Sequence, residues 1–199
     1  MNETETEIME ATYRALCEHG YASLRMQDIA DETTKTKAAL HYHYDTKHEL
    51  LLAFLEFIHE EFVENLETIE GDDPVTRLRT YIHERLTPHD EQQHQRFQTA
   101  LLEIKAQAPY DDAYHERLAE FDRRSYAFVH ELLIEGIENG TVRSDIDAER
   151  VGEFFVTTIN GAETRHVAIN HPIEETRDFL LGYIDTTLLA EESPEVAAR

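Results

Sequence analysis

The 199-residue chain is poor in several residue types, and each shortage excludes a class of protein. It has one cysteine, Cys17, so it cannot form an internal disulfide. No apolar run approaches the roughly 18 to 20 residues that span a bilayer, and no basic amphipathic helix offers itself to anionic lipid. The first ten residues are acidic rather than apolar. We therefore expect a cytoplasmic protein with no membrane role.

Catalytic sequence patterns are also missing. The chain contains no H-E-x-x-H zinc motif, no G-x-S-x-G nucleophile motif and no glycine-rich phosphate loop. Twelve histidines leave open a metal-sensing regulator that uses His83, His89 or His94, although solvated histidines are the simpler explanation. We expect no enzymatic activity, no cofactor and no metal site.

Lysine is scarce and acid is abundant. Only four of the 18 basic residues are lysines, against 42 acidic residues, and the formal net charge is −24. Because 41% of the residues are hydrophobic, including nine Phe and nine Tyr, the chain has the means to fold. This composition is typical of a surface kept soluble in molar salt, where self-repulsion is screened, so we expect a salt-adapted source. An acidic mesophilic protein is the alternative.

Three of the four lysines, Lys35, Lys37 and Lys47, fall within residues 33–48. With Asp45 as the single acid, this window carries +2, whereas residues 1–32 carry −6 from two arginines and eight acids. A local basic patch in an acidic chain indicates contact with the phosphates of a nucleic acid. An acidic helical interaction protein that never binds DNA is the rival hypothesis, but such a protein has no reason to gather its lysines.

Apolar spacing is helical almost everywhere, which predicts an all-α fold of about nine helices. The expected helices cover residues 5–19, 26–32, 35–44, 47–69, 74–86, 91–107, 110–139, 148–169 and 173–190. Gly20 is expected to end the first helix in the left-handed conformation that only glycine adopts at low cost, and Asp73 to cap the fifth ahead of Pro74. We expect a DNA-binding domain over 1–50, a helical bundle over 51–191 and a frayed tail over 192–199.

The first three helices have the dimensions of a helix-turn-helix unit. A more specific signal comes from residues spread across them, namely Ile8, Ala11, Gly20, Tyr21, Ile29, Ala30, Leu40, Tyr42, His43, Tyr44, Lys47, Leu50 and Leu51. In their order and spacing these residues resemble the TetR family of transcriptional regulators. The chain departs from the family pattern at Thr34 and Lys35, where a glycine and an aliphatic residue are usual. It departs again at Ala38, which replaces a common glycine, and at His41, which replaces a common tyrosine.

The resemblance implies that the third helix lies in the major groove of double-stranded DNA. Short polar and basic side chains then reach base edges, while further basic and aromatic side chains hold phosphates. We expect base contacts from Thr36, Lys37 and His41, a thymine-methyl contact from Ala38, and phosphate contacts from Tyr42, His43 and Lys47. Leu40, Ile29 and Tyr44 are expected in the core beneath this helix.

Residues 131–163 also resemble the C-terminal part of many TetR-family proteins, which implies a dimeric repressor that a small-molecule effector releases from its operator. The resemblance implies a dimer seam on the last two helices, where Gly161 permits close approach. The expected seam residues are Val151, Phe154, Phe155, Thr158, Ile159, Ala162, Phe179, Leu180, Tyr183, Ile184 and Leu188. The expected effector residues, each also explicable as core, are Phe97, Leu101, Tyr114, Phe121, Phe128, Asn160 and His166.

Overall fold

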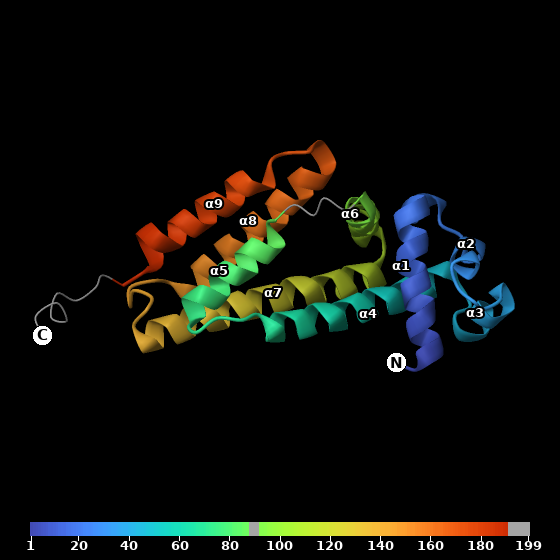
Figure 1. Ribbon diagram of the computed structural model, residues 1–199, viewed down its shortest axis with the longest axis horizontal. Helices are drawn as coiled ribbons and strands as arrows, with labels where there is room; N and C mark the ends of the chain where they lie inside the picture. The colour runs from blue at the N-terminus through green and yellow to red at the C-terminus, as the bar shows by residue number, and fades with distance from the viewer. Residues whose placement is uncertain (88–91, 191–199) are drawn as a thin grey trace, which may run out of the picture. The chain divides into compact units, whose positions relative to one another are not determined.

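The computed structural model describes residues 1–87 and 92–190, and within them it confirms an all-α fold. Figure 1 labels the nine α-helices of this part of the chain. They are α1 (Glu3–Ser23), α2 (Met26–Asp31), α3 (Lys37–His43), α4 (Lys47–Thr68), α5 (Pro74–Arg85), α6 (Gln92–Lys105), α7 (Asp112–Asn139), α8 (Ala148–Ile169) and α9 (Ile173–Tyr183). None of these helices is long and apolar enough to cross a membrane. The expected tail, 192–199, lies outside the described residues.

The cap expected at Asp73 is confirmed, whereas Gly20 departs from its expected conformation. Gly20 has a positive φ, 67°, but its ψ of 170° lies outside the left-handed helical region, and it breaks the helical path within α1, which runs on to Ser23. Asp73 accepts hydrogen bonds from the backbone N–H groups of Val75 (2.9 Å) and Thr76 (3.1 Å), with Pro74 in the first helical position. Side-chain hydrogen bonding by Thr76 lowers the pKa of Asp73, which keeps the capping charge in place.

Several expected boundaries were wrong: the first helix spans Glu3–Ser23 rather than 5–19, the third begins at Lys37 rather than 35, and the sixth ends at Lys105 rather than 107. Two further differences have a clear structural cause. The helix expected from residue 110 begins at Asp112, because Pro109 lies in a 3₁₀ turn (Ala108–Tyr110) and Asp111 caps the backbone N–H groups that follow. The helix expected to reach 190 ends at Tyr183 and continues as a π-helical turn, Ile184–Leu188. Here the backbone leaves the helix to pair with residues 141–143, and the N–H of Arg143 donates to the carbonyl of Leu188 at 2.9 Å.

The described residues pack as two compact units. The first contains residues 1–64 and the described part of 89–122, and the second contains 65–88 and 123–199 where they are described. Helix α6 packs against α1, so α6 and the start of α7 belong to the same unit as the first three helices. A DNA-binding domain that ends at residue 50 remains a prediction.

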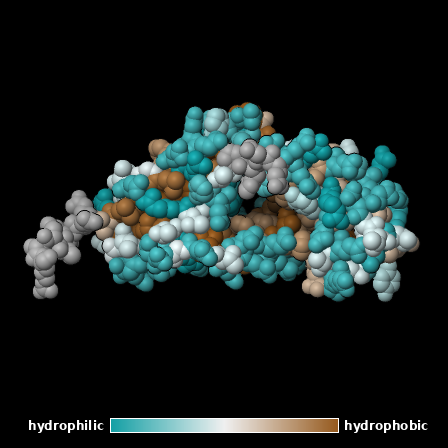
Figure 2. All heavy atoms as spheres, in the orientation of Figure 1, coloured by the Kyte–Doolittle hydropathy of each residue, from teal (hydrophilic) through white to brown (hydrophobic). Residues whose placement is uncertain are grey.

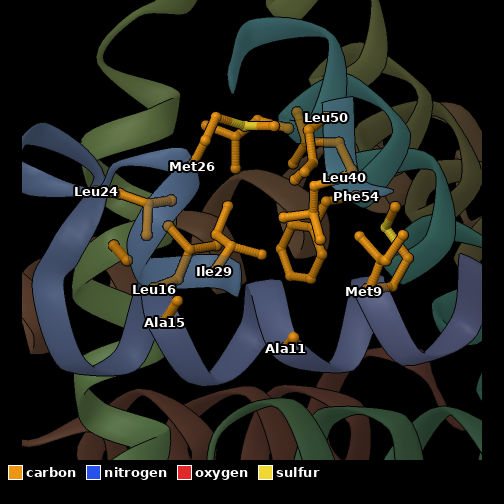
Figure 3. Close-up of a cluster of buried hydrophobic side chains, with 14 of the residues drawn as sticks. Met9, Ala11, Ala15, Leu16, Leu24, Met26, Ile29, Leu40, Leu50 and Phe54 are labelled. Atoms are coloured by element: carbon orange, nitrogen blue, oxygen red, sulfur yellow. The ribbon is translucent and has the colours of Figure 1, made fainter. Parts of the chain in front are cut away.

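The core of the first unit fixes α3 from one side. Figure 3 shows Met9, Ala11, Leu16, Ile29, Leu40 and Phe54 pointing toward one another from α1, α2, α3 and α4. Full burial of each large aliphatic side chain contributes about 1.5 to 3 kcal/mol. Leu40 is the one buried residue of α3, so the remaining side chains of this helix are available for other contacts. As expected, Leu40 and Ile29 are fully buried and Tyr44 packs against the cluster.

The second unit is organised around α5, α8 and α9. Helix α9 packs against both α8 and α5. A bidentate ion pair joins α5 to α8. Arg85 Nε donates to Glu163 Oε1 at 2.7 Å, and Arg85 Nη2 donates to Glu163 Oε2 at 2.8 Å. Arg85 Nη1 also donates to the hydroxyl of Tyr81 at 3.1 Å. This geometry makes Arg85 a fixed structural cross-link in the unit.

Candidate nucleic-acid interface

Helix α3 begins directly after the turn that follows α2. Thr36 caps it, because its hydroxyl accepts a hydrogen bond from the backbone N–H of Ala39 at 3.2 Å. The buried Leu40 anchors the helix to the core, and its neighbours on the opposite side are open to solvent. The result is a short helix that is held from beneath and presents a polar outer face.

The four residues expected to contact bases lie together on this outer face. Thr36, Lys37, Ala38 and His41 are all exposed. The Thr36 hydroxyl is also engaged in the cap. Lys37, Ala38 and His41 occupy positions one, two and five of the helix, where spacings of three and four residues place side chains on one face.

The three residues expected to contact phosphates differ in their surroundings. Tyr42 is 86% exposed and makes an edge-to-face contact with the half-buried His43, at 5.4 Å between ring centroids. Lys47 is half-buried at the start of α4, where its Nζ donates to the carbonyl of Tyr21 at 3.1 Å and lies 4.8 Å from the centre of the Tyr21 ring. Burial lowers the pKa of Lys47. Its ammonium therefore ties α4 to the end of α1 in the described arrangement.

Sequence reasoning missed Glu7, a residue of α1 that holds the turn between α2 and α3. Its Oε1 accepts hydrogen bonds from Thr33 Oγ1 (2.7 Å), Thr34 N (2.9 Å) and Thr34 Oγ1 (2.6 Å). Its Oε2 lies 3.1 Å from Lys35 Nζ. These contacts, the Thr33 and Thr34 hydrogen bonds above all, lower the pKa of Glu7 to about 2. Among 42 acidic residues, nothing in the sequence distinguishes this carboxylate.

Arg14, two helical turns after Glu7 on α1, holds the end of α2. Its Nη2 donates to the carbonyl of Glu32 at 2.9 Å, and its Nε donates to Glu32 Oε2 at 3.3 Å. Residues seven apart lie on the same side of an α-helix. One face of α1 therefore fixes Glu32 through Arg14 and the next residues of the turn through Glu7.

Helix α6 and the start of α7 also contact the ends of α1 and α4. Glu103 of α6 accepts a hydrogen bond from the backbone N–H of Tyr21 at 2.7 Å, just after the Gly20 kink. The Tyr21 ring packs edge-to-face on Tyr114, at 6.2 Å between centroids.

At the start of α4, His48 contacts the residue that precedes α7. Asp111 Oδ2 lies 2.7 Å from His48 Nε2, and the cap hydrogen bond from the Tyr114 N–H lowers the pKa of Asp111. The sequence alone did not indicate these pairs.

The expected effector residues of the first unit are largely occupied by packing. The ring of Phe97 lies 4.7 Å from Tyr13 and 6.2 Å from Phe54, between centroids. Tyr114 is buried in the core cluster, and burial raises its pKa. Phe121 contacts His59 and Phe62, with centroids 4.9 and 5.7 Å apart. Leu101 is half-buried against the same core cluster as Phe97.

The other three expected effector residues lie in the second unit. Phe128 is buried, with its ring 5.3 Å from that of Tyr81 and 5.6 Å from the guanidinium of Arg77. His166 Nδ1 lies 3.0 Å from the carbonyl oxygen of His171, just beyond the end of α8. Asn160 is half-buried on α8. Their role toward an effector remains a prediction.

The expected dimer-seam residues fall into two sets. One set is buried inside the second unit and comprises Val151, Phe155, Ile159, Ala162, Leu180, Ile184 and Leu188. The other is partly or fully exposed and comprises Phe154, Thr158, Phe179 and Tyr183. Phe154 is 37% exposed and Phe179 62% exposed, which is unusual for phenylalanine. The second set, together with the exposed Gly161, is the part that a partner can reach.

The described part of the structure does not bring the histidines considered for metal binding together into a site. No group of three or more His, Cys, Asp or Glu side chains there has the arrangement of a metal site. His83 is exposed on α5, and His94 lies on α6, 3.2 Å from the side-chain nitrogen of Gln98. His89 lies outside the described residues. Cys17 is buried, and burial raises the pKa of its thiol.

The sequence and this helical arrangement are similar to those of known families and relatives. The family model described as "Bacterial regulatory proteins, tetR family" matches residues 8–54, and "BetI-type transcriptional repressor, C-terminal" matches residues 74–189. Among curated proteins, the transcriptional repressor AcnR of Corynebacterium glutamicum is 22% identical over 180 residues, 89% of this chain and 90% of that protein. The regulator TtgR of Pseudomonas putida is 34% identical over 76 residues, which span only 36% of its length and 38% of this chain.

Solved structures extend the similarity to nearly the whole chain. A TetR transcription regulator from Haloarcula marismortui is 40% identical, with a TM-score of 0.86 over 94% of this chain and 100% of that one. A transcriptional regulator from Saccharomonospora viridis, crystallised with choline, has the same fold at 21% identity. Its TM-score is 0.76 over 96% of this chain and 100% of that one.

Proposed function

The chain belongs to the TetR family of transcriptional regulators, and we propose that it acts as a dimeric repressor that a small-molecule effector releases from its operator. The observation that supports this proposal best is the outer face of α3. Lys37, Ala38 and His41 are exposed together on a helix that Leu40 anchors from beneath. A helix of this kind suits the major groove, where basic and short side chains meet base edges.

Phosphate contacts are proposed for residues around α3. Tyr42 and His43 lie at its end, and Lys47 follows within one turn of the next helix. The exposed hydroxyl of Tyr42 suits a phosphate oxygen. Lys47 contributes in either of two ways, by direct contact or by holding Tyr21 and the start of α4 in place.

We propose that the dimer forms through the exposed side of α8 and α9. Phe154 packs against Tyr183 with ring centroids 5.3 Å apart, and Phe179 lies on the same helix as Tyr183. Exposed aromatic side chains on two adjacent helices suit a four-helix seam with a second copy. DNA-binding dimers need their recognition helices about 34 to 36 Å apart to reach successive major grooves.

A matched pair of substitutions tests this seam. Phe154→Glu places a charge in the proposed interface, and Ile134→Glu places one at a site on α7 that is equally exposed, at 37%. Sedimentation-velocity centrifugation should report a monomer for Phe154→Glu and a dimer for Ile134→Glu and the unaltered chain. A dimer that persists in Phe154→Glu would place the interface elsewhere.

Effector release requires that a ligand favour a conformation that does not fit the operator. The contacts of Glu103, Asp111 and Tyr114 with Tyr21 and His48 provide a route from α6 and α7 to the DNA-binding helices within one compact unit. We propose that the effector acts by altering these contacts. Because a regulator of the same fold was crystallised with choline, quaternary amines belong in the first effector screen.

Two alternatives are less well supported. The role of an acidic interaction protein does not explain the exposed basic face of α3. The role of a metal sensor is not supported by any ligand cluster among the described residues. We propose no enzymatic activity, since the family consists of regulators and the chain carries no catalytic motif. The sign of regulation follows the repressors that the chain resembles.

Selection of duplexes from a random DNA pool by the purified full-length chain tests the proposed function. We expect enrichment of a two-fold symmetric sequence whose half-sites lie about one helical turn apart, or a multiple of it. Release of that duplex by a compound from the screen would complete the test. Failure to enrich any sequence at any KCl concentration would favour the acidic interaction protein.

A further inference from the structure

We propose that Glu7, although it carries the wrong charge to touch DNA, is a positioning residue for operator recognition. Its carboxylate holds the turn that sets where α3 begins. This inference rests on the proposal that α3 contacts bases. It assigns part of the specificity of the protein to a residue of α1, outside α2, α3 and the turn that joins them.

The turn between α2 and α3 has ordinary backbone geometry. The chain has Thr34 and Lys35 in the turn and lacks glycine throughout residues 32–36. In the described part of the chain, Asn170 is the one non-glycine residue with positive φ, so this turn runs entirely through ordinary backbone conformations. Its shape is therefore not set by glycine, and something else must select it from the other conformations open to these residues.

Hydrogen bonds to Glu7 hold the turn. Glu7 accepts two hydroxyl hydrogen bonds and one backbone N–H hydrogen bond from Thr33 and Thr34, at 2.6 to 2.9 Å. The Thr33 hydroxyl in turn accepts from the N–H of Lys35 at 3.1 Å. Hydrogen bonds to an ionised carboxylate are stronger than those between neutral groups. Thr36, the cap of α3, follows immediately, so the start of the recognition helix is tied to α1 through Glu7.

Considered by its charge alone, Glu7 should weaken DNA binding, which is the opposite of a positioning role. Removing one carboxylate near DNA lowers electrostatic repulsion, and it frees Lys35, now 3.1 Å from Glu7 Oε2, to meet a phosphate. If Glu7 had no positioning role, neutralising it should tighten binding to every duplex. If Glu7 positions α3, neutralising it should weaken binding to the operator in particular. The two hypotheses therefore predict changes in operator affinity of opposite sign.

The experiment compares Glu7→Gln with Glu10→Gln in the full-length protein. Glu10 lies one turn further along α1, is exposed, and makes a long contact with Arg14, at 3.9 Å. Both changes remove one negative charge from the same helix. Affinities are measured for the operator selected with the unaltered protein and for an unrelated duplex, and melting temperatures are recorded by circular dichroism.

We expect Glu7→Gln to lose about tenfold in operator affinity, as for impaired hydrogen bonds to a charged group, with unchanged or tighter binding to unrelated DNA. Glu10→Gln should bind both duplexes as well as the unaltered protein or better. Operator binding by Glu7→Gln that equals or exceeds that of Glu10→Gln would overturn the inference. If the unaltered protein selects no operator at all, the proposed function fails, which is a separate outcome.

A second variant keeps the test decisive if Glu7→Gln does not fold. Thr34→Ala removes one hydroxyl donor, now 2.6 Å from Glu7, and leaves the charge of Glu7 and the exposed face of α3 intact. We expect a severalfold loss of operator affinity with unchanged binding to unrelated DNA. Equal loss on both duplexes, or no loss, would contradict a positioning role for the carboxylate.

Discussion

At the scale of single residues, the lysines that the sequence groups together have separate structural roles. Lys37 is exposed on the outer face of α3, whereas Lys35 is paired with Glu7 and Lys47 with the carbonyl and ring of Tyr21. A cation already bound within the protein costs more to redirect toward a phosphate than a free one. Of the three, Lys37 is best placed to contact DNA directly.

Substitution of each lysine by alanine separates these roles. Lys37→Ala should lower operator affinity by about tenfold, the typical cost of one specific contact, and leave the free energy of unfolding within about 0.5 kcal/mol. Lys47→Ala should lower the free energy of unfolding by about 1 to 2 kcal/mol, since it loses a hydrogen bond and a cation–π contact. Urea titration and fluorescence anisotropy measure the two quantities. Unchanged operator affinity in Lys37→Ala would remove that residue from the interface.

Glu7 also gives the protein a predictable pH dependence. Its pKa is lowered from 4.5 to about 2 in the folded state, so its contacts stabilise the fold fully above about pH 4.5. That stability is lost as the pH falls toward about 2. The difference in melting temperature between the unaltered chain and Glu7→Gln should therefore be constant near neutral pH and shrink below about pH 4.5. A difference that does not change with pH would show that the carboxylate is not held in solution.

The sequence predicted which residues surround α3 better than it predicted their partners. The outward positions of Lys37, Ala38, His41 and Tyr42 follow from helical spacing around the apolar Leu40. The pairing of Glu7 with the turn depends on which of many carboxylates reaches it across the fold, and a spacing pattern carries no such information. The same limit applies to Glu103 and Tyr21, which are 82 residues apart in the chain.

At the scale of secondary-structure elements, the helix ends carry much of the geometry. Gly20 redirects the chain between the body of α1 and the approach to α2, and Glu103 holds the backbone immediately after it. A β-carbon at Gly20 would lie 3.2 Å from Glu103 Oε2, in addition to the backbone strain of φ 67°. A side chain at this corner would therefore displace the Glu103 carboxylate by a few tenths of an ångström and would strain the backbone.

Gly20→Ala should lower the free energy of unfolding by about 1 to 3 kcal/mol, because φ 67° with ψ 170° is a region occupied essentially by glycine alone. Gly182→Ala is the control, since a β-carbon there meets nothing within 4 Å and the residue is helical. The control should be neutral or stabilising by up to about 1 kcal/mol. Chemical denaturation measures both, and equal stability of the two variants would contradict the strain at Gly20.

The ends of helices were predictable where a capping residue or a helix-breaking residue marks them. They were less predictable where the backbone pairs with a segment distant in the sequence. Helix α8 begins at Ala148, the expected residue, and the side chain of Asp147 caps it by accepting from the N–H of Arg150 at 3.1 Å. The last helix was expected to reach residue 190, but backbone pairing of Leu188 and Ala190 with residues 141–143 ends it earlier. That pairing joins segments distant in sequence, and helical periodicity does not reveal it.

At the scale of the whole molecule, the net negative charge of the protein opposes the DNA binding that we propose for it. Each chain carries a formal −24, and Figure 2 shows hydrophilic side chains over most of the visible surface. We expect the proposed dimer, with twice this charge, to be repelled by DNA at low salt, and screening to weaken the repulsion as salt rises. For most DNA-binding proteins, salt instead reduces affinity through the loss of counterion release. The two effects oppose one another in this protein.

The most direct measurement is a fluorescence-anisotropy titration of the selected operator with the full-length protein, from submolar to molar KCl, with unrelated DNA as competitor. We expect saturable, competitor-resistant binding at two protomers or a multiple per site, with an affinity that stays level or rises with KCl. A steep loss of affinity over the same range would contradict the role given to the acidic surface. Absence of any preference for the operator at every KCl concentration would contradict operator recognition by α3.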